Sequence, residues 1–303
     1  MDVNTNISVI IPILNAGEQL KTLLQALDEQ TVKPKEILVV DSESKDDTKR
    51  IAEFAQLHVI SIERSKFDHG GTRDMALRQT RGDIVVFMTQ DALPTDKYFL
   101  ENLIAPFADT QIAAVSGRQI AYLNARPYER AVRAHNYPEE ELVWSMDDVN
   151  HLGVRAFRLS DVCAAYRKEA YFDVGGFDSP ILTNEDMLIA EKFLRNGYKL
   201  AYSSKASVFH SHNFTWMQEY RRNYIIGRTM KRYEARFQYV SEIGTGIKLV
   251  RDVMHDLVKE KCFLECAFFA MNCAARLLGN RVGRYLEEKA QREMGSSDTV
   301  GRI

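Results

Sequence analysis

The chain has 303 residues, of which 45% are hydrophobic and 27% charged, with a formal net charge of −2. This is ordinary globular composition and excludes a largely disordered chain. The near-neutral charge argues against broad nucleic-acid binding, which depends on a basic excess. The length allows one large α/β domain, or such a domain followed by a C-terminal extension.

Neither the N-terminal segment nor the cysteines indicate secretion. No basic region precedes an apolar one at the start of the chain, so we expect no signal peptide. No two cysteines form a Cys-x-x-Cys pair, so we expect buried reduced thiols in a cytosolic protein rather than a zinc site. The four cysteines are Cys163, Cys262, Cys266 and Cys273.

The first part of the chain alternates apolar runs with helical periodicities. Residues 7–14, 36–40 and 59–62 are short apolar runs that predict strands. Apolar residues at helical spacing predict one helix after the first strand and another after the second, which Asp46 or Asp47 caps. This order is typical of a nucleotide-binding half of an α/β sheet. No Gly-x-Gly-x-x-Gly follows the first strand, which argues against an NAD or FAD enzyme.

Polar side chains follow several predicted strands at the point where each strand ends. They are Asn15, then Asp41 with Ser42 and Ser44, and finally Asp91. Each one alone is typical of a turn former or helix cap. Ligands of open α/β sheets bind at the carboxyl ends of the strands. The set therefore predicts one ligand groove along that edge.

Three ordered motifs carry a resemblance to a known family: SVIIPILN at residues 8–15, ILVVDSESKD at 37–46 and GDIVVFMTQDA at 82–92. Together they resemble the inverting family 2 glycosyltransferases, and the similarity extends to about residue 224. The resemblance implies an α/β GT-A fold, with a mixed, mostly parallel sheet flanked by helices. It places a donor half at about 1–120, an acceptor and catalytic half at about 121–240, and a helical region at 241–303.

A glycine-rich segment, HGGTR at residues 69–73, precedes the strand at 84–88. Its glycines permit a tight turn into a helix whose free N–H groups can receive a phosphate, with Arg73 as charge partner. A plain capped helix start is the alternative. The combination of HGGTR with TQDA at 89–92 is similar to the rhamnosyltransferase branch of the family. That similarity implies dTDP-β-L-rhamnose as donor and a bacterial surface polysaccharide, such as O-antigen, as product.

The donor-binding residues that the resemblance implies lie mostly at strand ends and in the HGGTR and TQDA segments. They are Pro12, Leu14, Asn15, Asp41, Ser42, Ser44, His69, Gly70, Gly71, Arg73, Thr89, Gln90, Asp91 and Arg222.

Glu185 and Asp186 fall in the first turn of a predicted helix that ends at Gly197. A favourable charge–dipole interaction would account for both acids. The pair also aligns with the Glu-Asp motif of the resembled family, which implies Asp186 as general base and Glu185 as a positioning residue. Inversion needs an acceptor hydroxyl to attack opposite the leaving group, and a carboxylate in reach takes its proton.

The resembled family usually holds its metal with an Asp-x-Asp motif, but Thr89 replaces the first carboxylate and leaves Asp91 alone. Mg²⁺ or Mn²⁺ can bind one carboxylate together with diphosphate oxygens and water. His210 follows the last predicted strand, at 199–209, and the resemblance implies that it contacts metal or diphosphate. A structural histidine is the alternative. We expect a divalent metal at Asp91 and His210, with poor affinity in the absence of donor.

Residues 121–153 look irregular and poorly periodic, which is typical of a functional or mobile insertion, and in the resembled fold they border the acceptor. Trp144 can stack on a sugar or simply pack. Arg222 lies on a long helix predicted at 215–237, where it contacts diphosphate or belongs to a solvated basic face. The acceptor-binding candidates are Trp144, Asp161, His212 and Trp216.

Residues 261–279 are apolar on most of their surface, flanked by basic residues, and too short to span a bilayer comfortably. An in-plane membrane helix, packing on the catalytic domain and a homodimer contact all stay open. We expect a cytoplasmic enzyme at the cytoplasmic face of the inner membrane, acting on a glycan or lipid-linked glycan. The same fold with a UDP-hexose donor, or a non-catalytic nucleotide-sugar-binding subunit, are the alternatives.

Overall fold

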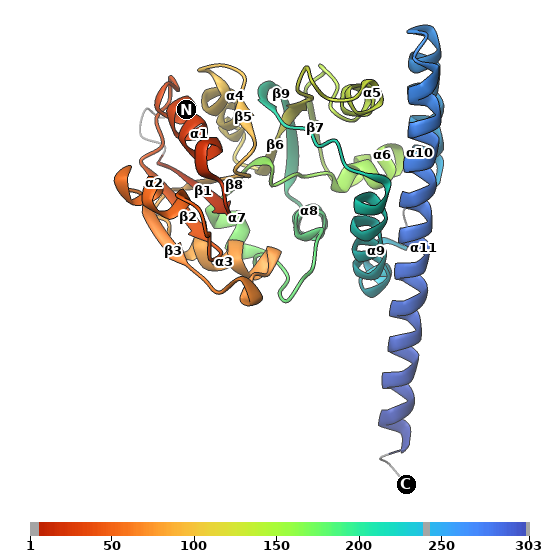
Figure 1. Cartoon of the computed structure of the whole chain (residues 1–303). Coiled ribbons are helices and arrows are strands. Elements are labelled where there is room, and N and C mark those ends of the chain that lie inside the picture. Colours follow the sequence, from red (N-terminus) through yellow and green to blue (C-terminus); the bar gives the residue numbers. More distant parts are fainter. Residues whose placement is uncertain (1–5, 239–242, 301–303) are drawn as a thin grey trace.

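In the computed structural model, which describes residues 6–238 and 243–300, nine strands form one mixed sheet (Figure 1). The order is β3-β2-β1-β4-β8-β6-β9-β5, and β7 pairs with β9. The strands are β1 Ile7–Ile13, β2 Glu36–Asp41, β3 His58–Ser61, β4 Ile84–Met88, β5 Leu93–Pro94, β6 Ile112–Ile120, β7 Leu142–Trp144, β8 Cys163–Arg167 and β9 Lys199–Phe209.

Strands β1 to β4 are parallel, and β8 is antiparallel to its neighbours β4 and β6. All five residues of β4 are buried, because helices cover both faces of the sheet. Helices α1, α2 and α4 cover one face, and α3, α7 and α8 cover the other. The helices are α1 Gly17–Asp28, α2 Thr48–Phe54, α3 His69–Gln79, α4 Phe99–Ile104, α5 Pro127–Asn136, α6 Val149–Leu152, α7 Lys168–Asp173, α8 Glu185–Arg195, α9 Trp216–Arg232, α10 Ile243–Lys259 and α11 Phe263–Val300.

The predicted strands and helices of the first half are present, with ends that differ by a few residues. The expectation of an irregular segment at 121–153 was wrong, because it contains α5, β7 and α6. Pro127 starts α5 at a position where proline is tolerated, and Tyr128 and Val132 form its buried face. The boundary predicted between residues 240 and 241 falls at 239–242, outside the described residues.

Helix α11 runs alongside α9 and extends beyond the rest of the molecule (Figure 1). Backbone touches backbone here: a Cβ on Gly279 would overlap the carbonyl oxygen of Tyr220, and one on Gly283 that of Tyr224. One turn further along α11, Glu287 is buried and pairs with the guanidinium groups of Arg228 and Arg232 on α9. Among the described helices, none combines the length and apolarity needed to cross a membrane.

Candidate active site

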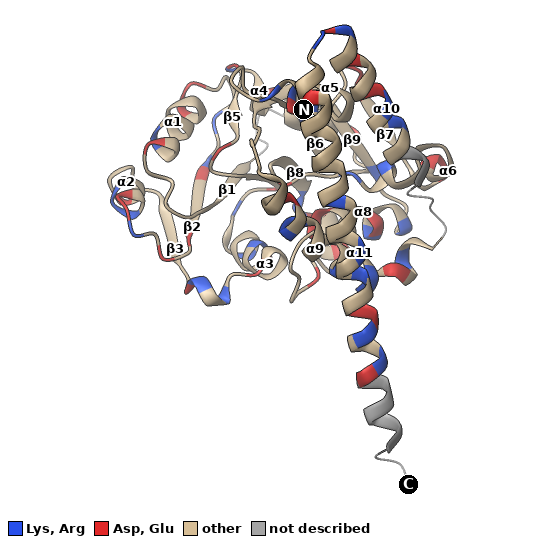
Figure 2. Ribbon diagram, turned by 45° about the vertical axis from the view of Figure 1, so that its right-hand side comes forward, with Lys and Arg blue, Asp and Glu red and all other residues tan. Residues whose placement is uncertain are grey.

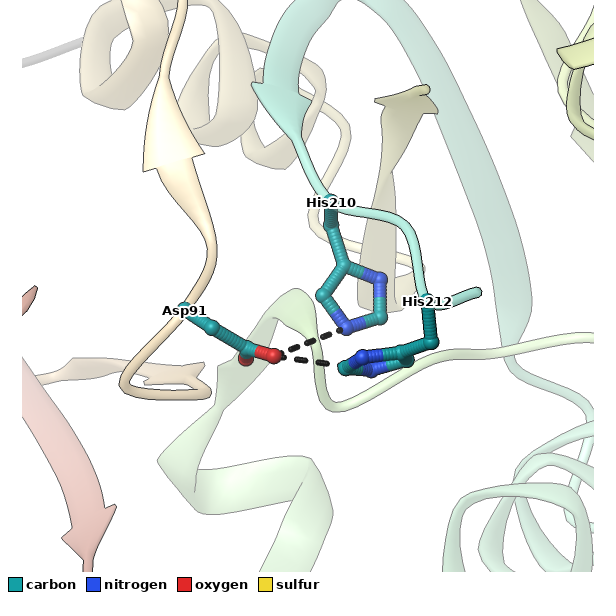
Figure 3. A group of neighbouring side chains, drawn as sticks. All are labelled: Asp91, His210 and His212. Carbon is teal, nitrogen blue, oxygen red and sulfur yellow. Dashed lines mark ion pairs between the residues drawn. The ribbon is translucent and has the colours of Figure 1, made fainter. Parts of the chain in front are cut away.

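Asp91, His210 and His212 converge at the carboxyl edge of the sheet (Figure 3). Asp91 Oδ2 lies 3.6 Å from Nε2 of His210 and 3.4 Å from Nε2 of His212. Asp91 follows β4 whereas the histidines follow β9, and the two strands are not neighbours in the sheet. The short strand β5 brings the two segments together. Its Leu93 pairs with Phe209, and this pairing holds the nearby Asp91 at the end of β9.

Hydrogen bonds fix which nitrogen of His210 is free. Its Nδ1 lies 2.9 Å from Oε1 of Gln119, and the Arg133 guanidinium donates to the same oxygen. That oxygen is therefore an acceptor, Nδ1 donates to it, and Nε2 keeps its lone pair toward Asp91. Burial lowers the pKa of His210 to about 3, and burial also lowers the pKa of His212. Two neutral imidazoles thus face one carboxylate oxygen.

Asp91, His210 and His212, which we call the Asp91 group, fit a divalent metal ion. One carboxylate oxygen and two imidazole nitrogens lie within 4.8 Å of one another. A histidine that binds metal usually donates its other N–H to a fixed acceptor, as His210 does to Gln119. Nitrogen ligands beside one carboxylate suit Mn²⁺ better than Mg²⁺, which prefers oxygen. Arg222 lies close enough for its charge to lower the pKa of both histidines.

A second group pairs the buried guanidinium of Arg73 with two acids, and the charge of a third, Asp186, also acts on it. Arg73 Nε lies 3.3 Å from Oδ2 of Asp161, and its Nη1 lies 3.2 Å from Oε1 of Glu185. His69 Nδ1 is 3.6 Å from the same Glu185 oxygen, and Tyr166 donates to Asp161 at 2.6 Å. Burial alone would lower the pKa of Arg73, but the acids around it raise that pKa. Arg73 is therefore a fixed cation.

The three acids differ in how readily they ionise. Burial opposes ionisation of Glu185, yet Arg73 lowers its pKa to about 2, so it is a carboxylate. Burial raises the pKa of Asp161 to about 6 despite Arg73. Asp186, at the start of α8, is partly buried; burial and then the charges of Glu185 and Asp161 raise its pKa well above the ordinary range. Asp186 is thus the acid best able to take up a proton.

The structure does not support the phosphate site expected at the start of α3. The Gly71 N–H donates to the carboxylate of Asp68 at 2.8 Å, so the helix is capped by its own chain. Side chains on Gly70 and Gly71 would overlap Asp178 and Ser179, which explains both glycines by packing. Arg73 is paired with acids rather than free for phosphate. The alternative of a plain capped helix start is confirmed.

The loops after β1 and β2 meet at the same edge as Asp91. Gln90 uses its whole side-chain amide on the Leu14 backbone: Leu14 N–H donates to Oε1 at 2.8 Å, and Nε2 donates to Leu14 oxygen at 3.2 Å. The Asn15 N–H donates to Ser44 Oγ at 2.8 Å, and Asp41 accepts from the Ser44 N–H at 3.3 Å. These hydrogen bonds join the loops to one another, while their contacts with a donor stay predictions. Three other predicted donor residues lie in the same segments. Pro12 is in β1, Ser42 is buried, and the Thr89 hydroxyl oxygen is buried without a hydrogen-bond partner in the described residues.

The four acceptor candidates lie in different surroundings. Trp144 is buried and its indole N–H donates to the Ala156 oxygen at 2.7 Å, so it packs in the core, and its ring also lines a cavity. Asp161 is enclosed beside Arg73, and His212 lies with Asp91 instead. Trp216 is 55% exposed at the first turn of α9. Trp216 is therefore the only one of the four candidates that is exposed enough to stack on a sugar at the protein surface.

Sequence reasoning missed the residues that hold His210. Gln119 Nε2 donates to Tyr137 at 2.7 Å and to Ser160 at 2.8 Å, and Arg133 is fixed by Glu129 at 3.0 Å. The spacing of Glu129 and Arg133, four residues apart, is a helical signal that could have identified α5. No sequence signal points from α5 to a histidine 77 residues later.

Comparisons with known proteins agree with this geometry. Residues 8–175 match the family described as Glycosyl transferase family 2. The O-antigen chain rhamnosyltransferase RfbN of Salmonella typhimurium is 34% identical over 286 residues, 92% of this chain and 90% of that protein. The O-antigen chain rhamnosyltransferase WbaN of Salmonella anatum is 35% identical, over 92% of this chain and 89% of that protein.

Solved structures share the fold. The mannosyltransferase PcManGT from Pyrobaculum calidifontis, in complex with GDP-Man and Mn²⁺, superposes with a TM-score of 0.56 at 19% identity. It covers 100% of this chain and 84% of that one. Residues 1–349 of S. aureus TarS give a TM-score of 0.54 at 18% identity, over 95% of this chain and 92% of that one. The expected GT-A fold is confirmed, and the chain belongs to glycosyl transferase family 2 as a glycosyltransferase.

Proposed function

We propose that this chain transfers L-rhamnose, with inversion, from dTDP-β-L-rhamnose to a hydroxyl of a growing, lipid-linked O-antigen glycan. The observation that carries the proposal is the likeness to two rhamnosyltransferases along about nine-tenths of the chain. The Asp91 group and Asp186 support it, because the first can hold a metal ion and the raised pKa of the second suits a base. This proposal includes the donor, the acceptor class and the residue roles.

In this mechanism Asp186 accepts the proton of the attacking hydroxyl. Glu185 stays ionised beside Arg73 and holds the start of α8 in place. Asp91, His210 and His212 would hold a divalent metal ion, and that ion would neutralise charge on the departing diphosphate. Arg222, exposed beside the histidines, contacts the same diphosphate.

The donor is tested by thermal shift against a panel of nucleotide sugars with Mn²⁺. We expect dTDP-rhamnose to stabilise the protein by about 2.7 kcal/mol at a hundred times its dissociation constant, and UDP-hexoses to have no effect. Stabilisation and hydrolysis of a UDP-hexose in place of dTDP-rhamnose would refute the donor assignment. Turnover by the isolated chain would exclude a non-catalytic subunit.

We further propose that α11 contacts the cytoplasmic face of the inner membrane. Every exposed residue of α11 from Phe263 to Leu278 is apolar. Lys and Arg residues, blue in Figure 2, occur on α10, in the turn that joins it to α11 and along α11. The exposed cations that fit an anionic lipid surface are Lys248, Arg251, Lys259, Lys261 and Arg281. A homodimer seated on the same face is the competing occupant.

Leu264→Glu and Leu278→Glu are each expected to reduce binding to vesicles containing anionic lipid at least about tenfold, because a buried leucine contributes about 1.5–3 kcal/mol. These side chains are 71% and 57% exposed, so the fold should tolerate both changes. Phe54→Glu is the matched control, since Phe54 is 91% exposed on α2. Flotation measures binding. A dimer that Leu264→Glu dissociates, without vesicle binding by the wild type, would assign the face to a second copy.

A further inference from the structure

A cavity of about 200 Å³ lies beside β6, β7 and β9, at the end of α5. Its walls include Tyr137, Trp144, Tyr202, Glu140, Arg155 and Arg158. No residue of the Asp91 group, and none of the acids around Arg73, lines it. It is smaller than the sites of about 300–1,000 Å³ that hold drug-sized ligands, so its size suits a single small ring.

The aromatic walls of the cavity are fixed by hydrogen bonds at their polar ends. The Tyr202 hydroxyl donates to the Pro138 oxygen at 2.7 Å, and the Trp144 indole donates to Ala156 at 2.7 Å. The Tyr137 hydroxyl accepts from Gln119 at 2.7 Å. Each ring therefore presents carbon to the cavity, and little side-chain entropy remains to be lost on binding.

Charged side chains also line the cavity, and the exposed ones, Arg155 and Glu140, stand at its rim. Neither Arg155 nor Arg158 has an ion pair within the described part of the chain, and Arg158 donates only to the Asn136 oxygen, at 2.6 Å. Burial lowers the pKa of the Arg158 guanidinium, and the charge of Arg155 acts in the same direction. Glu140, which is exposed, adds hydrogen-bond acceptors at the same rim. Donors, acceptors and fixed rings together suit a polyhydroxylated ring.

The cavity is also connected to the Asp91 group. Tyr137 forms one wall, and Gln119, which bonds its hydroxyl, accepts the Nδ1 proton of His210 at 2.9 Å. A ligand that rests on Tyr137 is thus two hydrogen bonds from the side chain that faces Asp91. The cavity therefore adjoins Gln119, which positions His210.

We propose that this cavity is a carbohydrate subsite, which holds one pyranose ring of the acceptor glycan. The ring that it holds is not the one attacked, because Asp186 does not line the cavity. Its carbon faces rest on Tyr137 and Tyr202, and its hydroxyls bond to the arginines and Glu140. The identity of the glycan rests on the proposed function, whereas the location of the subsite rests on the cavity alone.

The test uses rhamnose-containing O-antigen fragments of one, two and three sugars, released by mild acid from bacterial lipopolysaccharide. Binding to the full chain without donor is followed by saturation-transfer NMR and calorimetry. Arg155→Ala removes an exposed side chain, and Leu142→Trp narrows the cavity from a 43% exposed position. Arg64→Ala is the matched control, because Arg64 is exposed and remote from the cavity.

We expect both cavity variants to weaken binding of the longer fragments at least about tenfold, or about 1.4 kcal/mol, and to leave the single sugar unaffected. In transfer assays the same variants should raise KM for long acceptors and leave kcat and donor binding unchanged. Equal effects on short and long fragments, or no fragment binding by the wild type, would overturn the subsite. Fragment binding that depends on Arg155, without any transfer by the wild type, would instead overturn the proposed function.

Discussion

Asp186→Asn is expected to lower the turnover number about 100- to 10,000-fold, which is the usual contribution of a general base. Asparagine has nearly the same shape but cannot accept the proton of the acceptor hydroxyl. Donor binding should persist, because no contact made by Asp186 reaches the Asp91 group. Single-turnover transfer assays measure the loss, and thermal shift with dTDP-rhamnose measures donor binding.

The pH profile gives an independent check on the same residue. Because burial and then the charges of Glu185 and Asp161 raise the pKa of Asp186, its carboxylate form is lost at higher pH than in an ordinary aspartate near 3.8. Turnover should therefore fall as the pH drops through that raised value, and the acidic limb should vanish in Asp186→Asn. Asp47→Asn, at an exposed position, is the control. Wild-type turnover in Asp186→Asn would remove this residue from the role of base.

Asp91→Asn and His212→Ala are each expected to lower activity about 100-fold or more, because a metal that neutralises the diphosphate contributes several kcal/mol. EDTA should have the same effect on the wild type, and added Mn²⁺ should restore activity only there. Binding of Mn²⁺ in the presence of dTDP, followed by electron paramagnetic resonance, separates metal loss from misfolding.

His151→Ala is the matched control for the metal variants, since His151 is an exposed histidine outside the Asp91 group. Full activity of the wild type after EDTA treatment would contradict the metal assignment. Unchanged Mn²⁺ binding by His212→Ala would restrict the ligands to Asp91 and His210, as the sequence alone suggests.

The sequence predicts the positions of the polar strand ends well because local patterns determine them. Buried strands end in visible polar residues, so Asn15, Asp41 and Asp91 can be placed at one edge without any long-range contact. Glu185 and Asp186 can also be predicted from the sequence, because the start of a helix has a recognisable pattern.

The sequence does not reveal contacts between distant segments. His212 joins Asp91 only because β5 pairs with the end of β9. The sequence around Arg73 suggests a phosphate ligand. In the structure Arg73 instead pairs with Asp161 and Glu185, which come from two later segments of the chain. Helix α5 was missed because Tyr128 and Val132 are the only large apolar residues on its buried face, where the charged Glu129 lies between them.

The glycine contacts between α9 and α11 have a mechanical consequence. With the carbonyl of Tyr224 against Gly283, neither helix can slide along the other without a backbone clash. Helix α9 begins at Trp216, shortly after His212, and carries Arg222, so the two helices form one rigid unit that ends beside the Asp91 group. If α11 rests on a bilayer, this rigid pair of helices keeps a fixed distance between the lipid surface and the sugar that is transferred.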